Sequence, residues 1–356
     1  MHLDIMLLGF GNVGRALAEL LIEKAALLEA QYGLSYTVTG IATRSKGRVI
    51  NPKGIDLRQA LDLTAAGKPL DTLPGSLPPQ SDTGLAFLRA CPADLVFESI
   101  WLDPQWGQPA TDYARAALSA GRHYVTANKG PVAFAYRELR DLARTKGVGF
   151  FFESTVMDGG PVLAVGREGL PGAYIKRIRG VLNSTTNSIL CRIEEGLSYE
   201  AALAEMQAVG LAESDPSNDV DGWDAAVKIV VLANVLMGAD LRPSDVAREG
   251  IRHLAPEAVR GAAQAGDHFK LLCEAWREGD TVAASVRPSR LPDTDPAARV
   301  RGTSSIVSYQ CDILPELTII EHDPSPRTTG YGMLADMVNI ARGRHRGLAR
   351  EPEAFR

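Results

Sequence analysis

The sequence has little of what marks secreted, membrane-spanning or disordered proteins. Only four of its 356 residues are cysteine, and no two form a CxxC pair, which argues against a zinc ribbon and a disulfide scaffold. Aromatic residues make up 6% and the net charge is -5, so a strongly basic nucleic-acid surface is not indicated. The longest apolar tract beyond the N-terminus, 225–238, contains Lys228 and is shorter than the roughly 20 residues of a membrane span. We therefore expect a globular protein with reduced thiols in the cytoplasm.

The first part of the chain alternates apolar runs with helical periodicity. A short apolar run is followed by a glycine turn and then by apolar residues at helical spacing over 15–29. Such alternation predicts an α/β fold with a Rossmann-type parallel sheet and helices on both faces. Many prolines and glycines between 46 and 80 predict a variable loop region. The predicted strands are 5–8, 36–42, 94–98 and 123–126, with a helix at 111–120.

A second region begins near Gly149 and has a different pattern. It predicts a strand over 174–182, helices over 186–195, 198–209 and 223–236, and a last helical pattern from Tyr331. We therefore expect a nucleotide-binding domain at 1–135 and an α+β catalytic and dimerisation domain at 136–325. The segment 326–356 is expected to return to the nucleotide-binding domain.

A glycine motif, GxGxxG, lies between the first predicted strand and helix. Its glycines are Gly9, Gly11 and Gly14, which let the backbone approach a pyrophosphate at the N-terminus of a helix. A turn that serves packing alone is the alternative. The position of the motif between a strand and a helix favours dinucleotide binding.

The end of the second predicted strand indicates which dinucleotide is bound. An acidic residue there would bond the ribose of NAD, whereas a basic residue would meet the additional phosphate of NADP. Here Thr43, Arg44, Ser45 and Lys46 follow the strand, with no acid among them. NADP is favoured, with NAD as the alternative. Solvated loop charges are the less favoured explanation for Arg44 and Lys46.

The segment 210–228 concentrates ionisable residues before and within an apolar helix. Asp224 and Lys228 are four residues apart and share a helix face, so a surface ion pair is the ordinary interpretation. A lysine in so apolar a helix instead favours a cleft, where it can donate or accept a proton. The other acids of the segment are Glu213, Asp215, Asp219 and Asp221.

Three further segments are candidates for binding. The sequence NSTTN at 183–187 ends a strand and begins a helix, so it can hold a carboxylate or only cap the helix. Lys129 follows a strand at the sheet's carboxyl end, where ligands of such folds bind, or is an exposed loop lysine. Glu153, before a glycine-rich turn, could offer a carboxylate oxygen and neighbouring carbonyls to a hard cation.

These segments together resemble homoserine dehydrogenases. The motifs that carry the resemblance extend over about two thirds of the chain, and the last of them is the most specific. They are GFGNVGRAL at 9–17, TANKGPVA at 126–133, ESTVMDGGPV at 153–162, GVLNSTTNSIL at 180–190 and GLAESDPSNDVDGWDAAVKIVVLA at 210–233.

The resemblance implies a reversible, NAD(P)-linked interconversion of L-homoserine and L-aspartate 4-semialdehyde, a step toward threonine and methionine. It implies a homodimer that pairs through a sheet of the second domain. It assigns proton transfer to Lys228, cofactor and substrate contact to Lys129, and catalytic roles to Asp224 and Glu213. The implied substrate-binding residues are Glu213, Asp219, Asp224, Thr185, Ser184 and Lys129. The implied cofactor-binding residues are Gly9, Phe10, Gly11, Asn12, Val13, Gly14, Arg44, Ser99 and Lys129. The implied site for a sodium or potassium ion comprises Glu153, Val156, Asp158 and Gly160.

The sequence departs from the family pattern in three places. Ser184 stands where many relatives have glycine, and Met157 and Asp158 replace small residues of the cation loop. The turn 322–329, HDPSPRTT, lacks the glycines usual before the last helix. The chain after Ile340 is too short for the ligand-sensing domain of regulatory members, so we expect none.

Two other functions fit parts of the pattern. A cysteine-dependent semialdehyde dehydrogenase joins a similar cofactor domain to thiol chemistry, but it requires an activated cysteine beside a base. No cysteine here has that setting in the sequence. A dinucleotide-binding sensor without catalysis is the second alternative.

Overall fold

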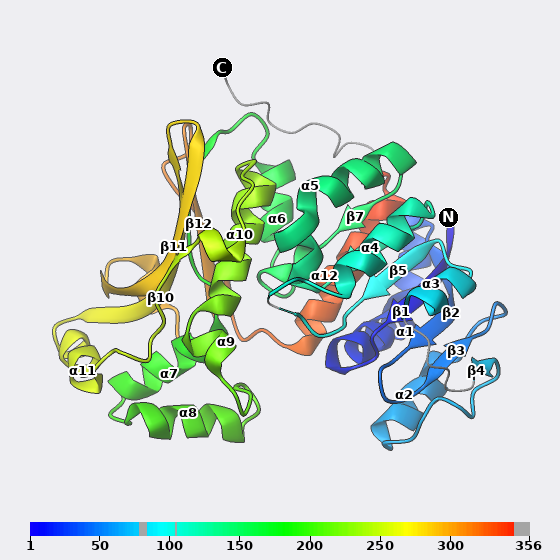
Figure 1. Cartoon of the computed structure of the whole chain (residues 1–356), viewed down its shortest axis with the longest axis horizontal. Helices are drawn as coiled ribbons and strands as arrows, with labels where there is room; N and C mark the ends of the chain where they lie inside the picture. Colours follow the sequence, from blue (N-terminus) through cyan, green and yellow to red (C-terminus); the bar gives the residue numbers. More distant parts are fainter. Residues whose placement is uncertain (78–83, 104, 345–356) are drawn as a thin grey trace. The chain divides into compact units, whose positions relative to one another are not determined.

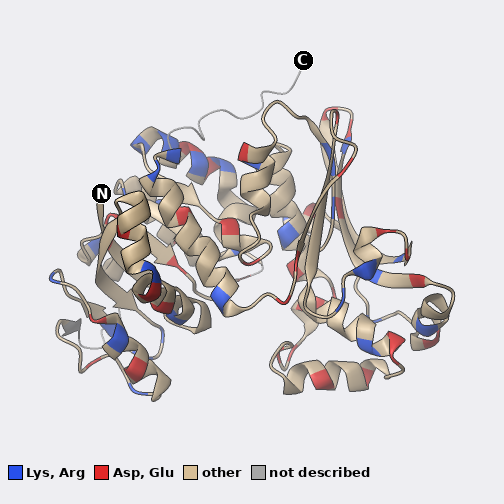
Figure 2. Cartoon of the chain, turned by 180° about the vertical axis from the view of Figure 1, so that it is seen from behind, with Lys and Arg blue, Asp and Glu red and all other residues tan. Residues whose placement is uncertain are grey.

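The computed structural model describes residues 1–77, 84–103 and 105–344. The chain forms two compact units. Unit 1 comprises Met1–Gly159 and the chain from Ser325 onward, and unit 2 comprises Gly160–Pro324. The first boundary thus lies further along the chain than the predicted 135, because one helix continues to Lys146 and a further strand joins the same sheet. Figure 2 shows acidic and basic residues interspersed along the ribbon of each unit.

Unit 1 is built on a seven-stranded sheet in the order β4-β3-β2-β1-β5-β6-β7. The five strands from β2 to β7 in this order pair in parallel, and β3 joins β2 antiparallel. The described strands are β1 (His2–Leu8), β2 (Ser35–Ala42), β3 (Arg48–Ile50), β4 (Ser76–Leu77), β5 (Leu95–Glu98), β6 (His123–Thr126) and β7 (Phe150–Phe151).

Helices of unit 1 share one apolar core with this sheet. Figure 1 shows α1 and α12 side by side, and Leu17 and Leu21 of α1 share the core with Met333 and Met337 of α12. The helices are α1 (Asn12–Tyr32), α2 (Leu57–Ala65), α3 (Gly84–Ala90), α4 (Ala110–Ser119), α5 (Lys129–Lys146) and α12 (Pro326–Ala341), and a 3-10 turn, η1, covers Glu153–Thr155.

Two local expectations for unit 1 need correction. The predicted loop at 46–80 contains β3, α2 and β4, because its prolines lie outside these elements and Asp56 caps α2 by accepting from the backbone N–H of Arg58. The last helix begins at Pro326 rather than near Tyr331. Ser325 caps it through a hydrogen bond with Thr328, and proline is well suited to the first helical turn.

Unit 2 is a mainly antiparallel sheet, in which only the described edge strand β9 pairs in parallel, with helices packed on it. The strand order is β13-β12-β8-β10-β11-β9, and β10 and β11 form a long hairpin. The strands are β8 (Ile175–Val181), β9 (Ala247–Arg248), β10 (Asp267–Glu278), β11 (Thr281–Pro292), β12 (Ser305–Cys311) and β13 (Leu317–Glu321). This unit is the α+β part of the predicted fold.

The helices of unit 2 include one that is mostly apolar and is buried over most of its length. This is α10 (Trp223–Leu236), in which eleven residues are buried while Lys228 is only partly covered. Both α7 and α10 pack against β10. The other helices are α6 (Val162–Ala164), α7 (Ser184–Glu194), α8 (Tyr199–Ala208), α9 (Ser217–Val220) and α11 (Pro256–Gln264), with short η segments at Val165–Gly169, Pro243–Asp245 and Pro296–Arg299.

Among the described residues, no helix is both long and apolar enough to cross a membrane. The four cysteines, Cys91, Cys191, Cys273 and Cys311, are free and buried.

Candidate active site

The glycine turn of unit 1 has the shape of an anion cradle. A Cβ atom on Gly14 would lie 2.4 Å from the carbonyl oxygen of Gly9, so this position requires glycine for close packing. Gly9 has φ +98°, and a Cβ there would lie 2.7 Å from the carbonyl oxygen of Ser99. By contrast, a Cβ on Gly11 would meet nothing within 4 Å, and no side chain caps α1. An open helix N-terminus with exposed N–H groups fits the pyrophosphate of a dinucleotide.

The remaining predicted cofactor residues of unit 1 lie at the same sheet edge. The backbone N–H of Gly9 donates to Ala42 at the end of β2, and that of Ser99 donates to Leu8 at the end of β1. Strand order reverses between β1 and β5, and ligands of such sheets bind outside the carboxyl ends at this reversal. Phe10 is buried, whereas Asn12 and the partly buried Val13 open α1.

The segment after β2 presents one exposed and one anchored base. Arg44 is exposed, and Lys46 Nζ donates to the carbonyl oxygen of Gly67 at 2.6 Å. An additional phosphate on the ribose would therefore meet Arg44 more readily than Lys46.

Lys129 is the first residue of α5 and is partly buried. The preceding residue, Asn128, caps the helix by accepting from the N–H of Gly130 at 2.8 Å. The lysine therefore starts from a fixed backbone position at the carboxyl end of β6.

The predicted cation loop is held by α12. Glu153 is 4% exposed and its backbone N–H donates to Asp336 at 3.0 Å. Asp158 has a left-handed φ of 42°, and its carboxylate accepts from the hydroxyl of Thr329 at 2.5 Å. No group of three or more His, Cys, Asp or Glu residues suited to a metal occurs in the described parts of the chain. The predicted ligands are one carboxylate, that of Glu153, and the backbone carbonyls of Val156, Asp158 and Gly160. The absence of a side-chain group therefore does not test this site, and the cation stays a prediction.

In unit 2, the first turn of α7 meets the two aspartates predicted to bind substrate. Asn183 caps α7 by accepting from the N–H of Thr186, and its side-chain amide donates to Asp219 at 2.7 Å and to Asp224 at 3.1 Å. Burial, followed by the neighbouring charge of Asp224, raises the pKa of Asp219. A ligand ammonium beside the two carboxylates would relieve that repulsion.

Lys228 joins the same cluster from α10. Its ammonium lies 3.5 Å from a carboxylate oxygen of Asp224 and donates to the carbonyl oxygen of Leu182 at 2.7 Å. The side chain is 14% exposed, so the amine is largely shielded from water. An ammonium held beside carboxylates, with part of its surface open, can transfer a proton to an oxygen placed against it.

Other predicted substrate residues lie less centrally. The hydroxyl of Thr185 donates to Leu211, and that of Ser184 donates to Thr303 at 2.8 Å. Glu213 is exposed, and its carboxylate stands outside the hydrogen bonds that join Asn183 to the aspartates. The structure thus gathers Asp219, Asp224 and Lys228 and leaves Glu213 on the loop before α9.

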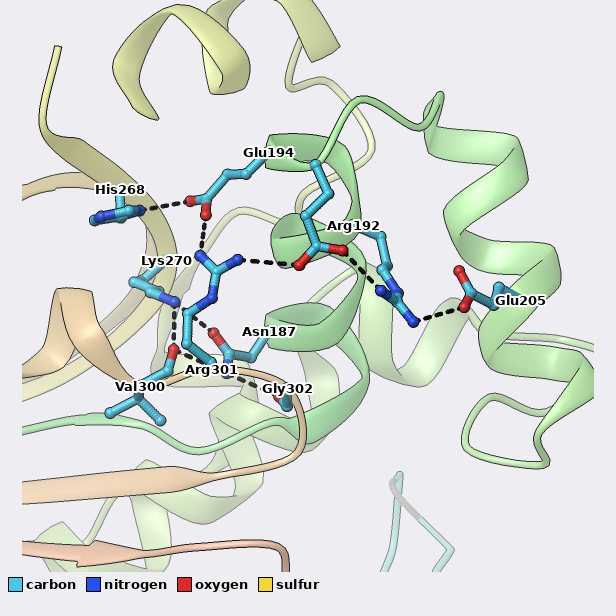
Figure 3. A network of polar contacts seen from close by, with 10 residues as sticks. Asn187, Arg192, Glu194, Glu205, His268, Lys270, Val300, Arg301 and Gly302 are labelled. Atoms are coloured by element: carbon cyan, nitrogen blue, oxygen red, sulfur yellow. Dashed lines mark hydrogen bonds and ion pairs between the residues drawn. The ribbon is translucent and has the colours of Figure 1, made fainter. Parts of the chain in front are cut away.

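The sequence interpretation missed a buried lysine beneath α7. Lys270 of β10 is 0% exposed, and its ammonium donates to Asn187 at 2.9 Å and to the carbonyl oxygen of Val300 at 2.5 Å. Figure 3 shows these contacts, and also Asn187 donating to Gly302 and Arg301 paired with Glu194. Asn187 ends the NSTTN segment, so this network anchors the first turns of α7. A lysine inside the apolar run FKLLC was the available signal.

A polar hollow of about 310 Å³ lies elsewhere in unit 2. Arg248, whose guanidinium lies 3.7 Å from the centre of the Trp223 ring, is one of its walls. Its lining includes neither Lys228 nor the two aspartates that contact Asn183, so we do not assign it to the substrate.

Comparisons with known proteins all point to one family. The family model described as homoserine dehydrogenase matches residues 161–338. The chain is 34% identical to an NAD(+)-dependent homoserine dehydrogenase of Pseudomonas canavaninivorans, with 98% of each chain covered. It is 34% identical to a homoserine dehydrogenase of Methanocaldococcus jannaschii over 95% of this chain and 98% of the relative.

Solved structures give the same result for the fold. A putative homoserine dehydrogenase of Archaeoglobus fulgidus has a TM-score of 0.83 and 31% identity, with 95% of this chain and 99% of that chain covered. A hyperthermophilic archaeal homoserine dehydrogenase in complex with NADPH has a TM-score of 0.81 and 29% identity, with 95% and 97% covered.

Proposed function

Because this chain belongs to the homoserine dehydrogenase family, its activity is the reversible, NAD(P)-linked interconversion of L-homoserine and L-aspartate 4-semialdehyde, and we propose how its own residues carry out that reaction. A bound nicotinamide supplies or accepts the hydride. The residues described above bind the two ligands, orient them and move the proton. The observation that carries this assignment is the cluster of Lys228, Asp224, Asp219 and Asn183.

Lys228 is the proposed proton donor in the reductive direction. Its ammonium protonates the oxygen that develops negative charge on the aldehyde, and the neutral amine accepts that proton in the oxidative direction. Asp224, 3.5 Å away, favours the charged form of the lysine between turnovers. The shared hydrogen bonds to Asn183 orient both aspartates toward the substrate ammonium, and Glu213 would join them from its exposed loop.

The first turn of α7 is the proposed site for the substrate carboxylate. Its N–H groups supply donors at the positive end of the helix dipole, and Thr185 would donate its hydroxyl to the ligand by giving up its hydrogen bond to Leu211. Ser184 anchors the turn through Thr303 instead of offering its hydroxyl to the ligand. Lys129 of unit 1 is proposed to contact both the dinucleotide and the substrate. Turnover therefore requires both molecules to be bound beside this lysine.

NADP is the proposed preferred dinucleotide. Arg44 is exposed after β2, and no acid lies among residues 43–46 to bond the ribose hydroxyls of NAD. One relative is named as NAD(+)-dependent, so NAD is the competing cofactor.

We also propose a sodium or potassium ion at Glu153 and the carbonyls of Val156, Asp158 and Gly160, and a homodimer through the sheet of unit 2. The free thiols fit the reducing cytoplasm.

A thiol mechanism finds no support in the cysteines. Burial raises the pKa of Cys91 and Cys311, and it raises the pKa of Cys273 to about 12. A thiol that stays protonated at neutral pH is a poor nucleophile.

The test is a spectrophotometric assay of nicotinamide reduction with L-homoserine. NAD and NADP are compared, each with and without potassium or sodium. We expect turnover with homoserine, a higher kcat/KM with NADP, and stimulation by one of the cations. Dinucleotide binding without turnover would instead support a sensor, and loss of turnover in a Cys273→Ala variant that still folds would support thiol chemistry.

A further inference from the structure

The cofactor edge of unit 1 contains a fully buried carboxylate. Glu98 is the last residue of β5 and is 0% exposed. In the sheet it lies between Leu8, the last residue of β1, and Thr126, the last residue of β6. It therefore adjoins the reversal of strand order at which a dinucleotide binds.

The hydrogen bonds described for the Glu98 carboxylate all come from neutral donors. The hydroxyl of Thr126 donates to Oε2 at 2.6 Å, the N–H of Ile100 donates to Oε1 at 2.7 Å, and the hydroxyl of Tyr124 donates to Oε2 at 3.3 Å. These dipoles favour the ionised form, but burial opposes it more strongly and raises the pKa of Glu98 to about 7.

In the described part of the chain, the titratable groups whose pKa values respond to the charge of Glu98 include two tyrosines. Tyr124 comes from β6 and Tyr113 from α4, and burial raises the pKa of both, so both are neutral near pH 7. Arg48 of β3 and Asp112 of α4 act on Tyr113 with opposite signs. A change of charge at this edge near neutral pH therefore belongs to Glu98.

The carboxylate also connects the two loops beyond the strand reversal. Thr126, which donates to Glu98, accepts in turn from the N–H of Asn128 at 2.8 Å. The side chain of Asn128 donates to the carbonyl oxygen of Trp101 at 3.1 Å and caps the helix that begins with Lys129. Glu98 thus fixes the segment after β5 to the segment after β6. These segments lie across the reversal from Arg44 and the end of β2, so they adjoin the nicotinamide half of the dinucleotide.

We propose that Glu98 is a positioning residue whose buried negative charge makes this edge bind the oxidised dinucleotide, with its positively charged pyridinium ring, in preference to the reduced one. The proposal rests on the dinucleotide site proposed above. The hydrogen bonds of Glu98 come from neutral dipoles, so a cation at the edge supplies a charge of opposite sign in a poorly screened environment. The phosphates are common to both redox forms, so their interactions cancel when the two affinities are compared.

The sign of the pH effect follows from linkage. If the pyridinium favours ionised Glu98, then binding of NADP+ must lower the pKa of Glu98 and release a proton. The affinity for NADP+ therefore rises as the pH rises through about 7, whereas the affinity for NADPH, which lacks the ring charge, changes much less.

The experiment measures the dissociation constants of NADP+ and NADPH by calorimetry from about pH 6 to about pH 8, either side of the pKa of Glu98. The variants are Glu98→Gln and, as a matched control, Glu138→Gln, an exposed glutamate of unit 1 paired with Arg115. In the wild type and the control, we expect the ratio of the NADPH to the NADP+ dissociation constant to rise about fivefold over this range. In Glu98→Gln the ratio should stay constant, at or below its value for the wild type at the acid end.

A ratio in Glu98→Gln that still rises with pH, or a ratio in the wild type that is flat, overturns the proposal. Unaltered NADPH binding by Glu98→Gln would show that unit 1 remains folded. If that variant does not fold, Thr126→Val serves instead. It keeps the charge but removes the 2.6 Å donor, so the midpoint of the NADP+ transition should move to higher pH. An unmoved midpoint contradicts the proposal.

The outcome is separable from that of the proposed function. If homoserine is not turned over but the ratio of the NADPH to the NADP+ dissociation constant rises with pH as expected, only the proposed reaction is contradicted. If homoserine is turned over but this ratio does not depend on pH, only the proposed role of Glu98 is contradicted.

Discussion

Among the Asp, Glu, Lys, Arg and His residues that the structure describes, each unit buries one side chain completely behind its predicted binding elements, and the two are opposite in sign. Glu98 of unit 1 and Lys270 of unit 2 are both 0% exposed. Glu98 accepts hydrogen bonds from neutral donors, and Lys270 donates to the amide oxygen of Asn187 and the carbonyl oxygen of Val300. Both are held by dipoles, so both lose part of the stabilisation that water would give their charged forms.

The difference lies in what surrounds the two charges. Burial raises the pKa of Glu98 to about 7, and the described groups that donate hydrogen bonds to it are neutral. Burial lowers the pKa of Lys270, and the charge of Arg301 acts in the same direction, while Cys191 and Glu194 act in the opposite direction. The acid can therefore change charge near neutral pH, whereas the lysine has a carboxylate, Glu194, near it that supports its charge. A buried charge can thus serve as a switch or as an anchor, according to its neighbours.

The largest effect is expected when the proposed proton donor of unit 2 is removed. That change should slow the chemical step without weakening dinucleotide binding by unit 1. Lys228→Ala removes the proposed proton donor, so we expect kcat to fall by about 10² to 10⁴. The NADPH dissociation constant should stay unchanged, because the glycine turn is untouched. Steady-state kinetics and calorimetry measure the two quantities, and Lys146→Ala, at the exposed last position of α5, is the control. A raised KM with unaltered kcat would contradict proton transfer by Lys228.

The switch-like behaviour of Glu98 should also appear in the stability of the protein without ligand. The pKa of Glu98 is about 7 in the folded state against an ordinary value of 4.5, so the folded state binds the additional proton between these values. Stability therefore falls as the pH rises through this window, by about 3 kcal/mol in total. Glu98→Gln should lack that decrease.

Urea unfolding of wild type and Glu98→Gln across this pH range measures the difference, because other titrating groups contribute equally to both. Parallel stability curves for the two proteins would show that Glu98 does not titrate in this window. Glu138→Gln should behave as the wild type does.

The anchor in unit 2 should respond differently. Lys270→Met removes the ammonium donor of Asn187 and leaves Val300 only the longer hydrogen bond from the Asn187 amide, but it also removes a buried charge, so we expect a net loss of about 1–3 kcal/mol of stability. The KM for homoserine should rise, because Asn187 belongs to the helix that starts the proposed carboxylate site. NADPH binding should not change. An unaltered homoserine KM in a destabilised protein would limit Lys270 to a structural role.

The smallest effect is expected at the exposed edge of unit 1. Arg44→Ala should lower the preference for NADP over NAD by about two- to fivefold, because an exposed ion pair is screened by water. The ratio of kcat/KM values for the two cofactors is the measurement. If Arg44→Ala retains the full preference for NADP over NAD, another residue must discriminate between the two cofactors. The effects predicted for the Glu98 and Lys270 variants do not depend on that outcome.

The sequence predicted elements best where the signal was local. The boundaries of α10 and β6 agree with the predicted 223–236 and 123–126, because each segment has a local pattern of apolar and β-branched residues. The region 46–80 was interpreted as a loop because its prolines obscured a capped helix of nine residues. The burial of Glu98 and Lys270 could not be predicted from the sequence. The local sequence around a glutamate that ends a strand, or a lysine within a strand, does not distinguish a buried side chain from an exposed one.

By itself the sequence determined the strand, glycine turn and helix of unit 1 and the spacing that places Asp224 and Lys228 on one face of α10, since these depend on residues close together in the chain. Only the tertiary structure decided that Asn183 bonds both Asp219 and Asp224, and that Glu98 and Lys270 are excluded from water. Those properties depend on which distant segments pack against a residue, and packing sets both its hydrogen-bond partners and the cost of its charge.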